Sequence, residues 1–162
     1  MKKFDPFSYE HLFYEYEIKI EINEINQVLI LLKDLNTGDQ KTTYNRLNIL
    51  NFPALKNLKK QVTDILDKNN LLLDNSWAQL YNSNNKHTIH NHYGSAYSGI
   101  IYINGLEPSP TVFYDSLFNP YYHNFKKNTL IMFPSMIPHQ VENLKIDEQR
   151  LVISFNTKKN IK

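Results

Sequence analysis

The feature that most restricts the fold of this chain is a series of short apolar runs that begins at residue 71. The runs are rich in β-branched and aromatic residues, prolines stand between several of them, and no helical period of apolar residues separates them. Strands this short, without helices between them, predict a sandwich or barrel and not a parallel sheet with crossover helices. The five runs are LLLDNSWAQLY at 71–81, YSGIIYI at 97–103, TVFYD at 111–115, TLIMF at 129–133 and RLVISF at 150–155.

The preceding part of the chain has a mixed pattern. Charged and apolar residues alternate over residues 14–22, as in a half-buried strand. Apolar residues recur at helical spacing over residues 23–35, which predicts an amphipathic helix. A second helix is predicted to begin at Pro53 and to end at Asn69, because proline suits a first helical turn and asparagine suits a helix end.

The composition is that of a globular domain. The 162 residues are 41% hydrophobic and 21% charged, so the chain can bury a core, and its length suits one domain. There is no internal repeat and no Gly/Ser-rich linker. We therefore expect a single domain, with residues 1–70 as a helical bracing segment and residues 71–158 as the β-core.

The absence of cysteine limits the chemistry. It excludes disulfides, Cys-ligated zinc, iron–sulfur clusters and a Cys nucleophile, so a metal must be held by His, Asp or Glu. The net charge of +2, without a basic stripe, gives no signal for a nucleic-acid partner. No apolar run approaches the ~18 residues of a membrane span, and the N-terminal segment MKKFDPFSYEHLF lacks the apolar region expected of a signal peptide. We expect a cytoplasmic protein without a membrane partner.

Three histidines are the candidate metal ligands. His90 and His92 stand two residues apart, so on a strand both side chains face the same way and two imidazoles can reach one ion. A third, His139, follows the strand TLIMF and the turn PSMIP. His87 lies three residues before His90 and is expected to face the opposite side of a strand, while His123 is expected in a surface loop.

Arg150 stands at the start of the last apolar strand. Such an Arg is usually a surface residue at a strand end, but near a metal site its planar fork suits bidentate binding of a carboxylate. Ser154 shares the face of Arg150 by the two-residue period and can reach the same carboxylate. Tyr102, on the strand after the histidine pair, faces either a bound ligand or the core, with the core favoured.

Four pieces of the chain, in this order, resemble the 2-oxoglutarate/Fe(II) oxygenase family that is common in marine phages and bacteria. They are SWAQLY, HNHYGSAYSGIIYI, FPSMIPH and RLVISFN, within residues 76–156, about half of the chain. The resemblance implies a double-stranded β-helix, also called a jelly roll, of the cupin-like kind. It implies Fe(II), 2-oxoglutarate and O2 as metal, cosubstrate and oxidant, and the host cytoplasm as location if a phage encodes the chain.

The same resemblance implies roles for individual residues. His90 and His139 would be iron ligands, and Arg150 would pair with the far carboxylate of 2-oxoglutarate. AlkB-type relatives carry an Asn-x-Tyr motif, and their first iron-binding His stands nine residues after the Tyr of this motif. Here Tyr81 stands nine residues before His90 and would hydrogen-bond the cosubstrate, while Gln79 holds the Asn position.

One position departs from the family pattern. The usual triad is two His and one carboxylate, with the carboxylate two residues after the first His. This chain has His92 there, so a three-His site would contribute no negative charge. Asp115, at the end of the run TVFYD, is an alternative third ligand, and a site with two protein ligands and water is a further one.

These residues predict a 2-oxoglutarate-dependent dioxygenase, an oxidoreductase that hydroxylates its substrate and releases succinate and CO2. One alternative is a jelly-roll module that binds a metal or ligand without turnover. Another is a cupin-like metal oxygenase that does not use 2-oxoglutarate. The sequence leaves the substrate open among a peptide, a nucleobase and a small metabolite, and it leaves the oligomeric state open.

Overall fold

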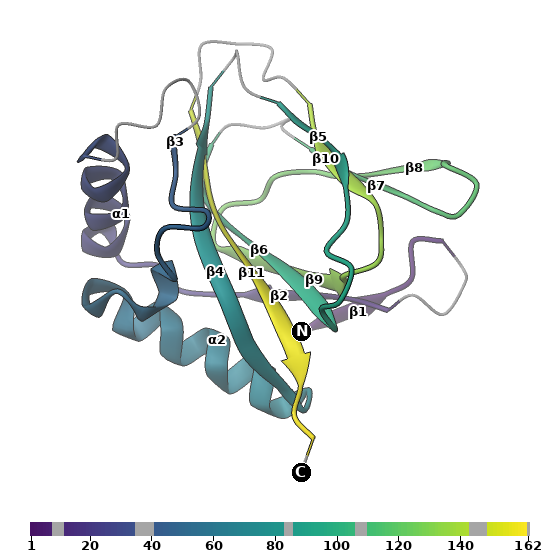
Figure 1. Cartoon of the computed structure of the whole chain (residues 1–162), viewed down its shortest axis with the longest axis horizontal. Coiled ribbons are helices and arrows are strands. Elements are labelled where there is room, and N and C mark those ends of the chain that lie inside the picture. The colour runs from purple at the N-terminus through teal and green to yellow at the C-terminus, as the bar shows by residue number, and fades with distance from the viewer. Residues whose placement is uncertain (8–11, 35–40, 83–85, 106–109, 143–148, 162) are drawn as a thin grey trace.

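The computed structural model describes residues 1–7, 12–34, 41–82, 86–105, 110–142 and 149–161. Within these residues the chain forms two antiparallel β-sheets that curve around a shared interior, with two α-helices outside the larger sheet (Figure 1). No helix of this described part is long and apolar enough to cross a membrane.

The larger sheet has seven strands in the order β1-β2-β9-β6-β11-β4-β3. The C-terminal strand β11 lies between β6 and β4, and it pairs with β4 from Arg150, opposite Tyr81, to Lys159, opposite Leu71. The strands are Lys2–Phe4 (β1), Phe13–Glu17 (β2), Lys41–Thr42 (β3), Leu71–Tyr81 (β4), Tyr97–Asn104 (β6), Thr129–Pro134 (β9) and Arg150–Lys159 (β11).

The smaller sheet has four strands in the order β5-β10-β7-β8. They are His87–His90 (β5), Thr111–Tyr114 (β7), Pro120–His123 (β8) and His139–Val141 (β10). In this order β8 is an edge strand, where a proline such as Pro120 removes no hydrogen bond to a further strand.

The two-residue period of the larger sheet separates two cores. On β11, Leu151, Ile153 and Phe155 belong to the core beneath the helices. Arg150, Val152 and Ser154 alternate with them and line the interior between the sheets. This alternation explains why the run RLVISF contains both an apolar set and a polar set of side chains.

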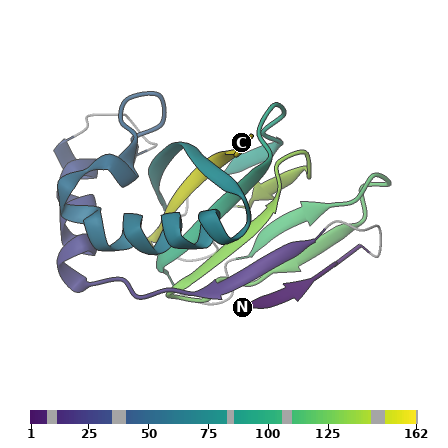
Figure 2. The ribbon, with the colours of Figure 1, turned by 90° about the horizontal axis from the view of Figure 1, so that it is seen from below.

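The helices cover the outer face of the larger sheet, on the same side of the molecule (Figure 2). They are α1 (Ile22–Asp34) and α2 (Lys56–Lys68), and two 3-10 turns, Ile49–Asn51 and Pro53–Leu55, lead into α2. Their fully or almost fully buried residues recur at helical spacing, as expected for an amphipathic helix against a sheet. These are Val28 and Leu32 on α1 and Leu58, Val62 and Leu66 on α2.

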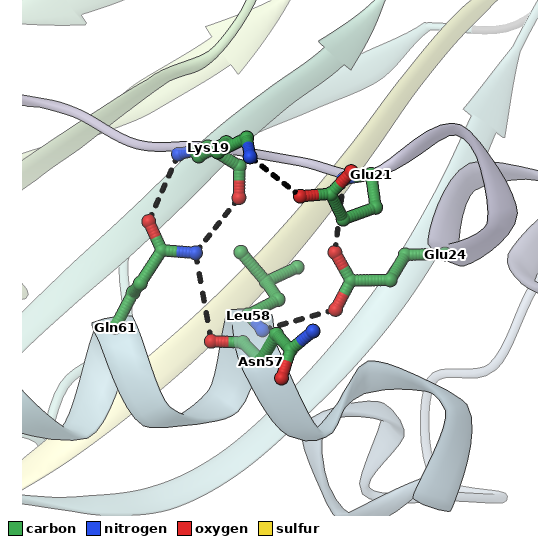
Figure 3. Close-up of polar contacts among 6 residues, drawn as sticks. All are labelled: Lys19, Glu21, Glu24, Asn57, Leu58 and Gln61. Carbon is green, nitrogen blue, oxygen red and sulfur yellow. Dashed lines mark hydrogen bonds and ion pairs between the residues drawn. The ribbon is translucent and has the colours of Figure 1, made fainter.

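A buried carboxylate joins the starts of the two helices (Figure 3). Glu24 is 3% exposed, and its two oxygens accept hydrogen bonds from the backbone N–H groups of Glu21 and Leu58, each at 3.0 Å. Both donors lie at helix N-termini, where N–H groups have no partner within the helix and the dipole favours a negative charge. Nearby, the Gln61 amide on α2 both donates to and accepts from the backbone of Lys19.

Replacing Glu24 by Gln should therefore destabilise the fold. The Gln side chain has one oxygen and one NH2 group where Glu24 has two oxygens, so one of the two backbone N–H donors must face the NH2 group and loses its acceptor. The free energy of unfolding should therefore fall by about 1–3 kcal/mol. Glu17→Gln is a matched control because the Glu17 side chain is 91% exposed. Urea unfolding measures both. Equal midpoints for Glu24→Gln and Glu17→Gln would contradict this role.

The N-terminal part differs from the sequence-based expectation. The predicted strand over residues 14–22 is shorter, because β2 ends at Glu17 and α1 begins at Ile22. Residues 1–70 are also more than a helical segment, since β1 and β2 belong to the larger sheet: β1 pairs with β2, and β2 pairs with β9, far away in the sequence. The first helix ends at Asp34 in the described part, and Leu35 lies outside it.

Candidate metal centre

Three histidines converge at the paired strands β5 and β10 of the smaller sheet. His90 ends β5, His139 begins β10, and the two stand opposite each other in the antiparallel pair. The strands β5 and β10 lie side by side in Figure 1. His92 follows β5, and its backbone N–H donates to the carbonyl of Ser135 at 2.9 Å. One ligand atom from each of the three histidines lies within 4.8 Å of the others. Three imidazoles this close can share one first-row metal ion, to which His nitrogen binds at about 2.1 Å.

Backbone carbonyls orient two of these rings. The Nδ1 of His90 lies 2.7 Å from the carbonyl oxygen of Thr88, and the Nδ1 of His139 lies 3.1 Å from that of Ile137. A carbonyl oxygen only accepts, so each ring must donate its Nδ1–H. The proton-free nitrogen is then Nε2, which is the arrangement that a metal-binding histidine needs.

Burial keeps the three imidazoles uncharged. It lowers the pKa of His90, lowers that of His92 to about 4, and lowers that of His139 well below its ordinary value. For His92 and His139 the neighbouring His90 acts in the same direction. At neutral pH all three rings therefore have a lone pair available, and the donor set fits a divalent ion.

His87 does not lie where strand alternation places it. Its ring stacks on that of His90, with 3.9 Å between the centroids, and both line the same pocket. The reason is a bulge. His139 pairs with His90 and Val141 pairs with His87, so an interval of three residues on β5 lies opposite an interval of two residues on β10. The extra residue on β5 shifts the alternation of its side chains by one position. Burial and the neighbouring His90 lower the pKa of His87 to about 4.

Arg150 is buried and lines the same pocket as the three histidines, so the reading as a surface residue is wrong. Its guanidinium lies 5.3 to 6.0 Å from the ring centroids of Tyr81, Tyr102 and Phe125. It donates a hydrogen bond of 2.8 Å to the hydroxyl of Thr111. None of the described residues that line the pocket is acidic, so the pocket suits an anionic ligand.

The other predicted site residues are distributed around this pocket. Tyr81 and Ser154 line it, and the Tyr81 hydroxyl lies 3.4 Å from the Nδ1 of His87. Burial raises the pKa of Tyr81 to about 12, so its hydroxyl keeps its proton and can donate. Gln79 lines an adjoining depression that it shares with His92. Tyr102 is not among the described lining residues, which agrees with the favoured core position.

Two further predictions concern residues away from the pocket. The carboxylate of Asp115 accepts hydrogen bonds from Leu117 and from both the backbone and the side chain of Asn119, so it caps the β7–β8 turn. It is not part of the histidine cluster. His123 is 6% exposed on β8, so its placement in a surface loop is wrong.

The sequence reasoning missed three residues of this region. The side on which His87 lies can be predicted only if the bulge in β5 is known, and no local sequence pattern indicates this bulge. Thr111 holds Arg150 from the opposite sheet, and a single hydroxyl at a strand start gives no signal. Trp77 lines the pocket, with its ring centroid 5.6 Å from that of His92, and the alternation of its strand could have placed it on the same face as Tyr81.

The comparisons with known proteins concern structure alone, since no protein-family model and no curated protein sequence matches the chain. A 2OG-Fe(II) oxygenase family oxidoreductase from Burkholderia pseudomallei matches with a TM-score of 0.63 at 11% identity, over 90% of this chain and 84% of that chain. A prolyl hydroxylase from Trichoplax adhaerens, solved with a hypoxia-inducible factor peptide, matches with a TM-score of 0.67 at 14% identity, over 91% and 83%.

A third match is the epimerase SnoN in complex with Fe3+, α-ketoglutarate and nogalamycin RO. Its TM-score is 0.65 at 10% identity, over 91% of this chain and 78% of that chain. At such low identities these likenesses concern the fold. They confirm the predicted double-stranded β-helix, and the three histidines lie inside it.

The geometry predicts one metal ion per chain, lost when a ligand is removed. Titration with Zn(II) or Co(II) should give a stoichiometry near one, and His139→Ala should weaken binding by more than about 100-fold, beyond the loss usual for a residue that only supports a ligand. His87→Phe is the matched control, because it keeps a ring stacked on His90 but offers no nitrogen. An His87→Phe variant that binds no metal would contradict the three-His assignment.

Proposed function

We propose that this chain belongs to the 2-oxoglutarate/Fe(II) oxygenase family and hydroxylates a substrate. The observation that carries the proposal is a single pocket, inside the jelly roll, lined by three clustered histidines and by a buried arginine. A metal site alone would fit many proteins. The buried cation beside it fits a cosubstrate that has a second, distant carboxylate.

His90, His92 and His139 would hold the Fe(II). With O2 and 2-oxoglutarate, the bound Fe(II) supplies the oxidation of a substrate C–H bond, and one oxygen atom goes to the substrate while the other goes to succinate, released with CO2. Because the three imidazoles are uncharged, the charge of the ion would be balanced by the dianionic cosubstrate and not by the protein.

Arg150, Tyr81 and Ser154 would bind the far carboxylate of the cosubstrate. Arg150 offers a planar fork that the rings of Tyr81 and Tyr102 help to hold in place. Tyr81, opposite Arg150 in the β4–β11 pair, brings a protonated hydroxyl to the same point. Apolar side chains such as Phe133 and Val152 form part of the wall and exclude water around the reacting groups.

The substrate would enter through the adjoining depression beside His92, which Tyr44, Trp77 and Gln79 also line. Tyr44 and Trp77 meet edge to face there, with 5.1 Å between their centroids. A peptide, a nucleobase and a small metabolite all remain open. Proteins of this fold bind a peptide in one case and a small molecule in another, since the Trichoplax neighbour was solved with a peptide and SnoN with nogalamycin RO.

The substitution of His92 for the usual carboxylate favours a second candidate, a jelly roll that binds a metal without turnover. Succinate formation from labelled 2-oxoglutarate separates the two functions. The oxygenase should produce succinate in the presence of Fe(II) and O2, and His139→Ala should abolish it. A wild-type protein that binds Fe(II) and 2-oxoglutarate but forms no succinate with any substrate class would favour the binding module.

The proposed carboxylate clamp predicts the effect of changing Arg150. In the Zn(II)-loaded protein, Arg150→Ala should raise the 2-oxoglutarate Kd by ~10- to 150-fold, the equivalent of losing ~1.4–3 kcal/mol of a charge-assisted pair. Arg150→Lys should rescue only in part, because a point charge cannot replace a bidentate fork. Calorimetry measures both. Unchanged cosubstrate affinity in Arg150→Ala would contradict the clamp, and unchanged Zn(II) affinity serves as the control for folding.

The proposed role of His92 predicts an asymmetry between two substitutions. His92→Ala removes a ligand and should weaken metal binding, whereas His92→Asp supplies the carboxylate of the commoner triad and should keep or strengthen it. Competition with a chromogenic chelator measures both affinities. Asp115→Ala is the control and should leave them unchanged, because Asp115 caps a turn. A site lost in Asp115→Ala but intact in His92→Ala would reverse the assignment.

A further inference from the structure

A continuous series of hydrogen bonds connects Arg150 on β11 with Glu15 on β2, another strand of the larger sheet. Arg150 donates to the Thr111 hydroxyl at 2.8 Å, and this hydroxyl lies 3.0 Å from that of Tyr102. The Tyr102 hydroxyl lies 3.3 Å from the Nδ1 of His123. The Nε2 of His123 lies 3.2 Å from the carboxylate of Glu15. The series crosses between the two sheets at every step.

The two ends of this series fix the direction of every proton within it. Glu15, as a carboxylate, can only accept, so the Nε2 of His123 must carry the proton. The Nδ1 of a neutral His123 then accepts from Tyr102. With its own proton committed to His123, the Tyr102 oxygen accepts from Thr111, whose oxygen receives the Arg150 N–H. A guanidinium only donates, so the donor end and the acceptor end agree.

The surroundings of His123 support the neutral form that this direction requires. Burial lowers the pKa of His123, and the positive charges of Lys2 and Arg150 act in the same direction, while Glu15 opposes them. The rings of Tyr102 and Phe4 lie nearly parallel to the imidazole, with centroids 5.7 Å and 6.4 Å from its own. Thr111 and Tyr102 are fully buried, so water does not compete for these bonds.

We propose that His123 and Glu15 are positioning residues for the carboxylate clamp: they direct the hydroxyls of Tyr102 and Thr111 so that Thr111 presents a lone pair to Arg150. Thr111, together with the Pro110 carbonyl that accepts from the other terminal nitrogen at 3.4 Å, fixes the plane of the guanidinium at the pocket. A guanidinium that is fixed in advance lowers the entropy cost of binding a carboxylate. This inference rests on the proposed function, since it assigns a control of affinity to the same site.

The test uses Glu15→Gln. The Glu15 side chain is 21% exposed, so this change is tolerable for folding. A Gln amide can donate to His123 as well as accept, and the proton direction is then no longer fixed. The Kd of 2-oxoglutarate for the Zn(II)-loaded protein should rise by roughly three- to tenfold, about one hydrogen bond. Glu17→Gln, on the same strand but 91% exposed, should leave this Kd unchanged.

A second ligand distinguishes positioning from a general loss of structure. Pyruvate has the keto acid end of 2-oxoglutarate but no far carboxylate, so its Kd should not respond to Glu15→Gln. In the Arg150→Ala background, Glu15→Gln should have no further effect on 2-oxoglutarate, because the group it positions is absent. Equal weakening of pyruvate and 2-oxoglutarate, or no weakening of either, would overturn the proposal.

A measurement without cosubstrate tests the proton direction itself. Long-range 1H–15N correlation spectra of the wild type should show His123 as the neutral tautomer with its proton on Nε2, and Glu15→Gln should change this pattern. A His123 protonated on Nδ1 at neutral pH would overturn the proposal. If the wild-type protein bound no 2-oxoglutarate, this result would instead contradict the proposed function, whatever the tautomer of His123.

Discussion

The burial of Arg150 between the two sheets is the constraint on which the interior depends. Removing a guanidinium from water costs several kcal/mol, and the cost is offset only by well-placed partners. Here those partners come from both sheets: Tyr81 and Tyr102 from the larger sheet, and Thr111 from the smaller one. The sheets must therefore pack in one arrangement for the cation to be tolerated, and that arrangement also brings Arg150 of the larger sheet to the pocket lined by His90 and His139 of the smaller sheet.

Much of the fold follows from local pattern. The strands β4, β6, β7, β9 and β11 were predictable because each coincides with a short apolar run rich in β-branched and aromatic residues. The short strands β5, β8 and β10 were not, since their sequences HTIH, PYYH and HQV contain no such run. A strand was predicted over part of β2, but the place of β1 and β2 in the larger sheet was not, since it depends on the pairing of β2 with β9, more than a hundred residues away. Such non-local pairing is decided by tertiary packing and leaves no local signal.

The site also combines residues that a local sequence pattern could identify with residues that it could not. His90, His92 and His139 could be found from spacing and resemblance, because ligand types in this order carry a recognisable chemistry. His87 was misplaced, since one extra residue on β5 shifts the alternation on which its prediction relied. His123 was misplaced because a polar sequence around it resembles a loop, whereas Glu15 and Tyr102 satisfy both of its nitrogens in the interior.

The central claim is that the histidines and Arg150 together accept Fe(II) and 2-oxoglutarate in one pocket. The most direct test is to add 2-oxoglutarate to the Fe(II)-loaded protein without oxygen and to record the visible absorption spectrum. Chelation of the metal by the keto acid should produce a saturable metal-to-ligand charge-transfer band, with one equivalent of cosubstrate per chain. A protein that binds Fe(II) through its three histidines and shows no such band at any 2-oxoglutarate concentration would contradict the account.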